Sequence, residues 1–209
     1  MPGSNQQVSL RWRTPDDTSQ TTWNWREHLM RVLPDAPWDE LNVSRGMHAL
    51  QVIATAPSAS AWLAANHARF ANDTNLLDLG KPRLVQTTVC ACSVEATYRV
   101  AMGVISKAGE PWGAWGSEGL PEKAREELSS RFAVQVSRRL ADFGVPVEAD
   151  ALCLKIVHDG QPRPIRMPET RAFALARKDL VIEMAWRLTG EIAVGRLNKV
   201  GYGRLFPAR

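Results

Sequence analysis

The sequence predicts an α+β fold in which each half of the chain forms an antiparallel sheet with one or two helices on one face. Three observations carry this prediction. Strand-like and helix-like patterns alternate in the first half, a break rich in glycine, proline and tryptophan follows at residues 106–118, and a long amphipathic helix with several strand-like runs completes the chain. Two halves of this kind indicate tandem ferredoxin-like (RRM-like) domains, which we expect at residues 1–108 and 109–209.

The elements of the first half follow from side-chain periodicity and from stop signals. Residues 7–13 alternate between apolar and polar side chains, which predicts a strand with Arg11 and Arg13 on its polar face. Capping residues at 16–19 and the stop at Pro34 place a helix between them. The remaining elements expected here are a strand at 47–56, a helix at 59–70 and two strands within 83–105.

The second half opens with a long helix from about Pro121 to Phe143, which Gly144 ends. Its apolar residues recur at helical spacing and predict one buried stripe. Three arginines lie beside that stripe: Arg131, Arg138 and Arg139. Strands are expected at 147–157, about 170–177, 179–188 and 203–206, with a glycine-rich turn before the last.

The charge of the chain is mildly basic, with a net charge of +4 over 209 residues and a pI of about 9.2. Of its 26 basic residues, 6 are lysine and 20 are arginine. The guanidinium fork of arginine suits phosphate groups and can stack on bases, so the bias is consistent with a nucleic-acid ligand. A GC-rich genome would produce the same bias without any function, and this alternative stays open.

Other classes of protein find little support in the sequence. The three cysteines form no disulfide framework, and none of the four histidines has a second ligand at metal spacing. We therefore expect neither a metal nor a cofactor. The polar first residues lack a signal peptide, and no apolar run is long enough to span a bilayer. A cytoplasmic protein without membrane contact is expected.

The segment 195–205 concentrates three glycines with the cations Arg196, Lys199 and Arg204. Consecutive N–H groups in a glycine-rich turn can form an anion-binding hollow, and the cations add full charges. A phosphodiester is the natural ligand of such a surface. The alternative is a glycine-rich hairpin that closes a sheet and carries a solvated basic face.

Ribonucleolytic cleavage without a metal needs few groups. The 2′-hydroxyl attacks the neighbouring phosphate, one group of near-neutral pKa moves its proton, and cations stabilise the charge that develops on phosphorus. His28 is the candidate proton carrier because it lies on the first helix near Arg26, facing the strand with Arg11 and Arg13. It could equally be a half-exposed helix residue without a role. Trp112 and Trp115, in the glycine-rich break, are candidates for stacking on unpaired bases.

Taken together, the closing segment and the overall plan resemble the CRISPR RNA-processing endoribonucleases of the repeat-associated (RAMP) superfamily. The pattern Gly195-x5-Gly201-Tyr202-Gly203 followed by Arg204-Leu205, with Lys199 two residues before the glycine pair, is similar to that family's terminal loop. It is most like the forms found in type I-E and type IV systems. The segment 132–147 resembles the family's second-domain helix and turn.

This resemblance implies cleavage of a CRISPR repeat hairpin at its 3′ base, without a metal, to leave a 2′,3′-cyclic phosphate. The implied ligands are the repeat hairpin and its product, with other subunits of a CRISPR effector complex as further partners. The family's histidine on the first helix falls at Arg26, whereas the actual histidine, His28, lies two residues on. The residues implied in RNA binding are Arg11, Arg13, Arg131, Arg138, Arg139, Arg196, Lys199, Gly201, Gly203 and Arg204.

Three hypotheses therefore remain open. The first is a metal-independent endoribonuclease that stays bound to its product hairpin, with His28 as proton carrier and Arg26 near the phosphate. The second is a non-catalytic RAMP-fold subunit that binds guide RNA, which the arginine at position 26 favours because arginine does not release its proton near neutral pH. The third is an unrelated ferredoxin-like binding domain whose arginines reflect genome composition.

Overall fold

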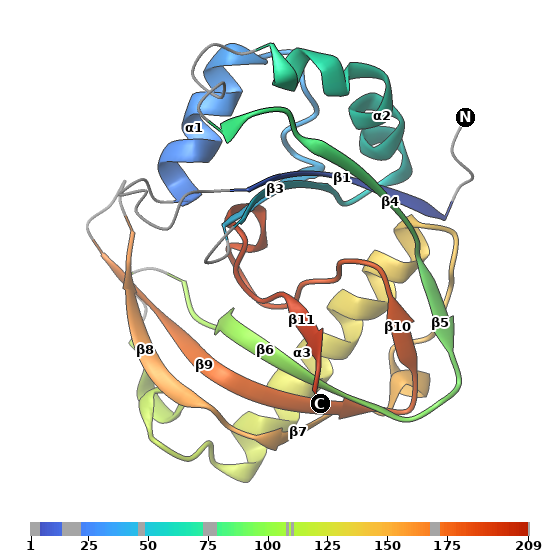
Figure 1. Cartoon of the computed structure of the whole chain (residues 1–209). Helices are drawn as coiled ribbons and strands as arrows, with labels where there is room; N and C mark the ends of the chain where they lie inside the picture. Colours follow the sequence, from blue (N-terminus) through green and yellow to red (C-terminus); the bar gives the residue numbers. More distant parts are fainter. Residues whose placement is uncertain are drawn as a thin grey trace. The chain divides into compact units, whose positions relative to one another are not determined.

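The structure is a computed structural model, and it describes residues 5–13, 22–45, 49–72, 79–107, 109, 111–167 and 172–208. The expected capping residues at 16–19 and His48 lie outside these ranges. Figure 1 shows the elements, which in chain order are β1 (Gln6–Arg13), α1 (Thr22–Val32), β2 (Leu41–Arg45), β3 (Ala49–Ala54), α2 (Pro57–Ala71), β4 (Arg83–Thr88), β5 (Cys90–Cys92), β6 (Ala96–Val104), α3 (Glu122–Asp142), β7 (Lys155–His158), β8 (Gln161–Arg166), β9 (Phe173–Met184), β10 (Arg187–Thr189) and β11 (Leu205–Pro207).

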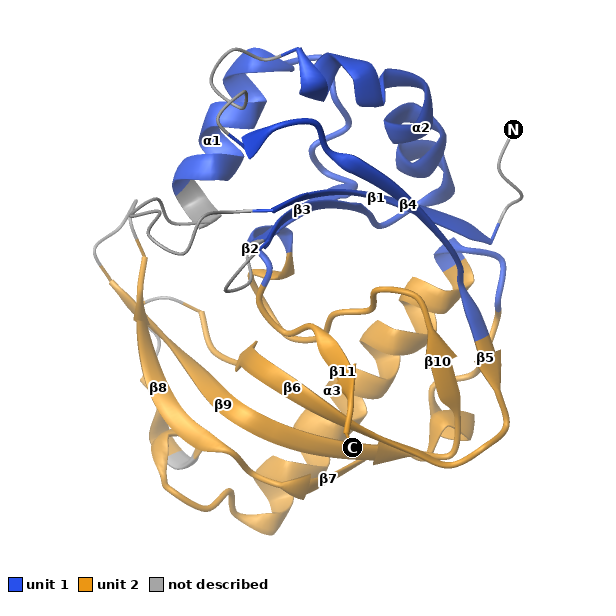
Figure 2. Ribbon diagram, in the orientation of Figure 1, with its two compact units in different colours: residues 1–90, 142–145, 199–201 blue, residues 91–141, 146–198, 202–209 orange. Residues whose placement is uncertain are grey.

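The chain divides into two compact units (Figure 2). Unit 1 comprises residues 1–90, 142–145 and 199–201, and unit 2 comprises residues 91–141, 146–198 and 202–209. The main change of unit falls before β6, because β6 pairs with β9 of the second half. The domain bounds expected from the sequence, 1–108 and 109–209, stay a prediction.

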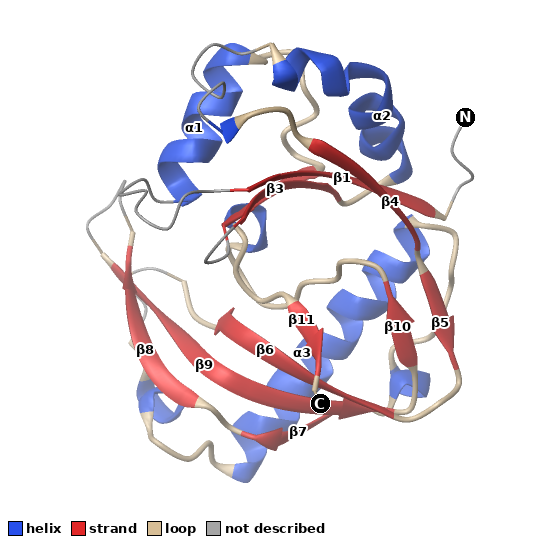
Figure 3. Ribbon diagram, viewed as in Figure 1, coloured by secondary structure: helices blue, strands red, loops and turns tan. Residues whose placement is uncertain are grey.

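Unit 1 is a βαββαβ arrangement with the strand order β2-β3-β1-β4, all neighbours being antiparallel. This is the ferredoxin-like order, in which the first and third strands are central. Helices α1 and α2 cover the same face of the sheet (Figure 3). The apolar face expected of β1 is confirmed, since Val8, Leu10 and Trp12 are at most 1% exposed and belong to the core beneath the helices. On the other face Ser9 is buried too, at 3% exposed, whereas Arg13 is exposed.

Unit 2 repeats this strand order as β11-β6-β9-β7, with β8 also pairing with β9. One long helix, α3, supplies the buried stripe predicted from the sequence: Leu128, Phe132, Val136 and Leu140 are at most 1% exposed. Where unit 1 has its second helix, unit 2 has β10 and the glycine-rich segment. The predicted class, α+β with tandem ferredoxin-like sheets, is therefore confirmed.

Strands β2, β5 and β8 were not expected from the sequence: two strands were expected within 83–105, where the structure has β4, β5 and β6. Strand β2 has only five residues, so its periodicity is a weak signal, although Gly46 separates it from the expected strand at 47–56. Strand β8 contains Pro162 and Pro164, which are disfavoured inside a sheet, but among the described strands β8 pairs with β9 alone, and proline is tolerated on an edge strand.

The break expected near residue 178 is wrong, because β9 runs without interruption from Phe173 to Met184. Within β9, Asp179 has a φ of 57°, a left-handed conformation that aspartate tolerates better than most residues.

Candidate functional site

The glycine-rich segment is packed closely against its own unit. A Cβ on Gly195, whose φ is +82°, would lie 2.6 Å from the carbonyl oxygen of Val104 at the end of β6. A Cβ on Gly203, whose φ is +74°, would lie 1.7 Å from the carbonyl oxygen of Val194. Only glycine fits such approaches at positive φ, so these two glycines serve backbone packing inside the protein.

Several N–H groups of this segment already have acceptors inside unit 2. Gly195 donates to Oε1 of Gln135 on α3 at 2.5 Å, Arg196 donates to the carbonyl of Val104 at 2.7 Å, and Gly203 donates to the carbonyl of Met102 at 2.8 Å. The expected hollow of consecutive free N–H groups is therefore wrong at these positions. These backbone hydrogen bonds fix the segment to β6 and α3. Any ligand of the segment would therefore be bound by its side chains.

The three cations of the segment have different surroundings. Arg204 forms an ion pair with Glu191, and both side chains are largely buried; its guanidinium also lies 5.1 Å from the centre of the Phe206 ring. Arg196 is exposed, and its guanidinium has neither a hydrogen-bond acceptor nor an ion pair among the described residues. Of these two cations, Arg196 therefore has its charge available to a ligand.

Residues 199–201 of the segment belong to unit 1. Nζ of Lys199 lies 2.8 Å from Oδ1 of Asp39, and this hydrogen bond lowers the pKa of the Asp39 carboxyl. Gly201 packs on β2, where an added Cβ would lie 2.8 Å from the Cα of Ser44. The ion pair is exposed, so solvent screens it and a phosphate could compete for Lys199.

The three α3 arginines also differ. Arg138 is exposed and has no partner among the residues described, whereas Arg139 is half-buried and engaged in an interaction. The guanidinium of Arg131 lies 5.9 Å from the centre of the Trp115 ring and donates to the carbonyl oxygen of Ile105 at 3.2 Å. The predicted basic helix face therefore presents only part of its charge.

A hollow of about 380 Å³ in unit 2 brings two of the predicted RNA-binding arginines together. Arg131 and Arg196, 65 residues apart in the chain, both line it, as does Trp115, one of the two tryptophans proposed for stacking. The other lining residues are Ile105, Ser106, Pro111 and Glu127. No pattern in the sequence indicated that these side chains would line one hollow.

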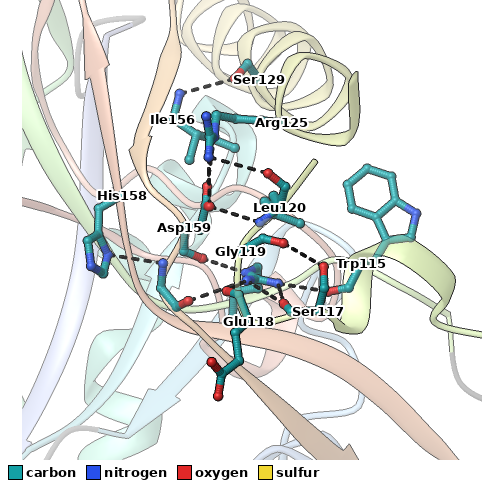
Figure 4. Close-up of polar contacts among 12 residues, drawn as sticks. Trp115, Ser117, Glu118, Gly119, Leu120, Arg125, Ser129, Ile156, His158 and Asp159 are labelled. Carbon is teal, nitrogen blue, oxygen red and sulfur yellow. Dashed lines mark hydrogen bonds and ion pairs between the residues drawn. The ribbon is translucent and has the colours of Figure 1, made fainter. Parts of the chain in front are cut away.

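A wholly buried arginine, Arg177 of β9, holds the loop that carries Trp115. It is 0% exposed and donates to carbonyl oxygens of two segments, residues 115–118 and the turn at 159–160. Figure 4 labels the acceptor residues Trp115, Ser117, Glu118 and Asp159. The acceptors are Trp115 at 2.8 Å, Ser117 at 3.0 Å, Glu118 at 2.6 Å, Asp159 at 2.5 Å and Gly160 at 3.5 Å. Burial lowers the pKa of Arg177, and the nearby Asp159 carboxylate partly offsets this.

The same turn carries a second set of contacts, also drawn in Figure 4. The Asp159 carboxylate accepts two hydrogen bonds from Arg125 of α3 and one from the N–H of Leu120, each at 2.9 Å. The hydrogen bond from Arg125 is the main cause that holds the pKa of Asp159 below its usual value. The sequence analysis missed Arg177, Asp159 and Arg125; the available signal was an arginine within the apolar run of β9.

In unit 1, Arg26 has a structural environment. Its guanidinium donates to the carbonyl oxygens of Leu41 at 3.0 Å and Trp38 at 2.8 Å, and it lies 5.6 Å from the centre of the Trp38 ring. Burial lowers the pKa of Arg26, and Asp39 partly offsets this. These contacts tie α1 to the segment that enters β2, so Arg26 has limited freedom to follow a substrate.

His28 lies one helical turn along from Trp25 and is half-buried. The two rings meet edge to face with their centres 6.3 Å apart, and His28 has a further interaction. On β1, Arg13 is exposed, whereas Arg11 is half-buried and lies opposite Gln51 on one side and Arg83 on the other. The structure thus keeps a partly accessible imidazole in the same unit as these arginines.

In the described ranges, no three side chains of His, Cys, Asp or Glu lie close enough together to hold a metal ion. None of the helices described is long and apolar enough to cross a membrane.

Solved structures share this fold over the whole chain. They have the tandem ferredoxin-like fold of solved Cas6 structures, and this chain has that fold. The structure of Csf5, a type IV Cas6 CRISPR RNA endonuclease, matches with a TM-score of 0.70 and 14% identity, over 98% of this chain and 100% of that one. A Cas6b structure matches with a TM-score of 0.63 and 11% identity, over 97% and 100%. Cas6 in a substrate mimic complex matches with a TM-score of 0.58 and 13% identity, over 98% and 100%.

No family model matches the sequence, and no curated protein matches it either. At 11–14% identity, the structural comparisons establish the fold and leave the roles of individual residues to be argued from this chain.

Proposed function

We propose that this protein is a CRISPR RNA endoribonuclease that cleaves the repeat hairpin of precursor CRISPR RNA and stays bound to the product. The observation that carries the proposal is the fold match over the full length of both chains with Csf5, a CRISPR RNA endonuclease. The exposed cations in both units, Arg13, Arg138 and Arg196, support it because RNA hairpins are bound largely through phosphate contacts and shape.

The proposed reaction needs no metal. The 2′-hydroxyl attacks the adjacent phosphorus, the bond from phosphorus to the 5′-oxygen breaks, and a 2′,3′-cyclic phosphate forms. His28 takes the proton of the 2′-hydroxyl or supplies one to the leaving 5′-oxygen, since imidazole is the side chain most often used for proton transfer in catalysis. Arg13, the exposed cation of β1, stabilises the charge on phosphorus.

Arg26 contributes in a different way from the one expected. Because its guanidinium holds the carbonyls of Leu41 and Trp38, we assign it a positioning role for α1, and through α1 for His28. Arg11, which is half-buried, lies on the same face of β1 as Arg13. The retained product would supply guide RNA to the further CRISPR effector subunits proposed as partners.

The test is incubation of the purified protein with a CRISPR repeat RNA in EDTA. We expect one cut at the 3′ base of the hairpin, a 2′,3′-cyclic phosphate end, and no cut when the attacking 2′-hydroxyl is replaced by hydrogen. His28→Ala should slow cleavage by a factor of about 100 or more and leave hairpin affinity unchanged. His67→Ala is the matched control, because His67 is an exposed histidine on α2, and it should cleave at the wild-type rate.

One observation favours a second function. Arg26 stands where the family resemblance expects a histidine, and its contacts hold it in a structural role. A guide-RNA-binding subunit without nuclease activity would need no proton carrier there. Tight binding of an intact hairpin by both the wild type and His28→Ala, with no cleavage over hours, would establish this alternative and exclude the nuclease.

A further inference from the structure

The hollow in unit 2 combines groups that suit a single unpaired nucleotide. Its volume of about 380 Å³ lies near the lower end of the range for small-molecule sites. Its lining residues all belong to unit 2, whereas His28 belongs to unit 1. It is therefore distinct from the group proposed for catalysis.

One wall of the hollow is a flat aromatic and cationic surface. The Trp115 ring is partly exposed, and the guanidinium of Arg131 lies 5.9 Å from its centre. The hydrogen bond from Arg131 to the carbonyl of Ile105 keeps this guanidinium in place. Unpaired bases stack on both tryptophan rings and arginine planes.

The other walls carry charges of opposite sign. Arg196 is exposed and has no ion-pair partner within the described residues, which makes it a ligand for a phosphate. Glu127, from the first half of α3, is exposed and makes no hydrogen bond or ion pair with the residues described. A carboxylate accepts hydrogen bonds from the exocyclic amino group of a base.

Both sides of the hollow rest on fixed backbone. The Trp115 carbonyl accepts a hydrogen bond from the buried Arg177 at 2.8 Å. The backbone at residues 195–196 is held by Gln135 at 2.5 Å and by the carbonyl of Val104 at 2.7 Å. A preformed site loses less entropy on binding than one that must be ordered.

We propose that this hollow binds one unpaired nucleotide that flanks the RNA hairpin. Its base lies against Trp115 and Arg131, its phosphate contacts Arg196, and its exocyclic amino group donates to Glu127. The site therefore prefers cytosine, adenine or guanine over uracil, which has no amino group. This inference rests on the proposed function, since it assumes that the protein binds a hairpin RNA.

The test compares one stem-loop RNA without a flank with the same stem-loop carrying three cytidines or three uridines on its 5′ or 3′ side. All proteins carry His28→Ala, so that cleavage does not consume the RNA. We expect a cytidine flank on one side to raise affinity about tenfold, in line with the stacking of one base. Trp115→Ala should remove this gain, Trp115→Phe should keep most of it, and affinity for the unflanked stem-loop should stay constant.

The base preference is tested separately. The protein should bind the cytidine flank at least about fivefold more tightly than the uridine flank, and Glu127→Gln should reduce this ratio toward one. Arg163→Ala removes an equal charge from exposed strand β8 and is the matched control for Arg196→Ala, which should weaken binding of the flanked RNA. Thermal melting of each variant checks that it is folded.

The outcomes separate the two proposals. Absence of any stem-loop binding would contradict the proposed function. Stem-loop binding with no gain from either flank, or an equal loss on flanked and unflanked RNA in Trp115→Ala, would overturn the nucleotide site while leaving the proposed function intact.

Discussion

The two sheets have the same ferredoxin-like strand order, but they differ in the connection into their last strand. This connection runs from β3 to β4 in unit 1 and from β9 to β11 in unit 2. In unit 1 this connection contains α2, whose backbone N–H groups bond mostly within the helix. In unit 2 it is β10 and the glycine-rich segment, and residues 185–204, all described, contain no α-helix. Backbone N–H groups of this segment donate instead to acceptors on β6 and α3.

The comparison explains why glycine is needed in one connection and not in the other. A helix satisfies its own N–H groups and keeps neighbouring backbone about one side chain away. The unit 2 segment lies directly on backbone, at distances that exclude a Cβ at Gly195 and Gly203. The result is a fixed loop that holds Arg196 beside α3.

The largest effect is expected from adding one carbon to the loop. Gly203→Ala places a Cβ only 1.7 Å from the carbonyl oxygen of Val194, on a residue whose φ is +74°. We expect a loss of more than about 3 kcal/mol in the free energy of unfolding, measured by chemical denaturation. The loop must move if the variant folds, so hairpin affinity should fall as well.

Two control variants sharpen this prediction. Gly80→Ala has a similar φ of +71° but no atom within 4 Å of the new Cβ, so only backbone strain remains, about 1 kcal/mol. Ala65→Gly, on the exposed face of α2, should also lose about 1 kcal/mol because glycine disfavours a helix. Equal losses in Gly203→Ala and Gly80→Ala would refute the close-packing explanation.

A smaller effect is expected from the ion pairs that anchor the two connections. Arg204→Ala leaves the Glu191 carboxylate, whose side chain is 13% exposed, without its cation. We expect a loss of about 2 kcal/mol. In unit 1, Arg69 of α2 pairs with Asp35 at 2.7 Å, but both side chains are about half exposed, so Arg69→Ala should leave the melting temperature almost unchanged.

The same series separates stability from RNA binding. Arg196→Ala should keep the wild-type stability, reduce the affinity for the flanked hairpin several-fold, and lower the salt dependence of that binding by about one counterion. If instead Arg204→Ala weakened binding more than Arg196→Ala while retaining full stability, the assignment of free and paired cations in this loop would be reversed.

The smallest effect concerns pH. The folded pKa of Asp159 lies below the value of the unfolded chain, about 3.9. Its contribution to stability is therefore complete above this pH and is lost as the pH falls through the folded pKa. Asp159→Asn should lose about 1 kcal/mol near pH 7, and this difference should shrink between about pH 5 and pH 2.

Melting temperatures of both proteins across this range provide the measurement. Asp35→Asn is the unit 1 control: Asp35 also has a lowered pKa through Arg69, but it is exposed and the pair is screened by solvent. A difference between wild type and Asp159→Asn that stayed constant down to pH 2 would mean that the carboxylate charge does not stabilise the turn.

Much of the fold could be predicted because its signals are local. The alternation in β1, the apolar stripe of α3 and the stop at Gly144 each depend on residues within one element. The elements that were missed lack such signals. Strand β8 with its two prolines exists because β9 offers it an edge, and β2 exists because β3 pairs with it.

The candidate site was predicted only in part. The sequence indicated which residues carry charge, and Arg196 and Arg131 do meet at one hollow with Trp115. It could not indicate that Arg26 is occupied by two carbonyls or that Arg177 is buried. Arginine has the same sequence signature whether it binds a phosphate or a loop.

The sequence by itself determined the helices, most of the strands and the position of a basic, glycine-rich ending, because these follow from periodicity and composition within short segments. Only the tertiary structure decided which cations remain available to a ligand. Lys199 pairs with Asp39, 160 residues away in the sequence, in an exposed ion pair for which a phosphate can compete. Arg204 is held by Glu191 in a largely buried ion pair, whereas Arg196 has no such partner among the described residues. The physical reason is that electrostatic interactions depend on distance and burial in space, and the fold sets both.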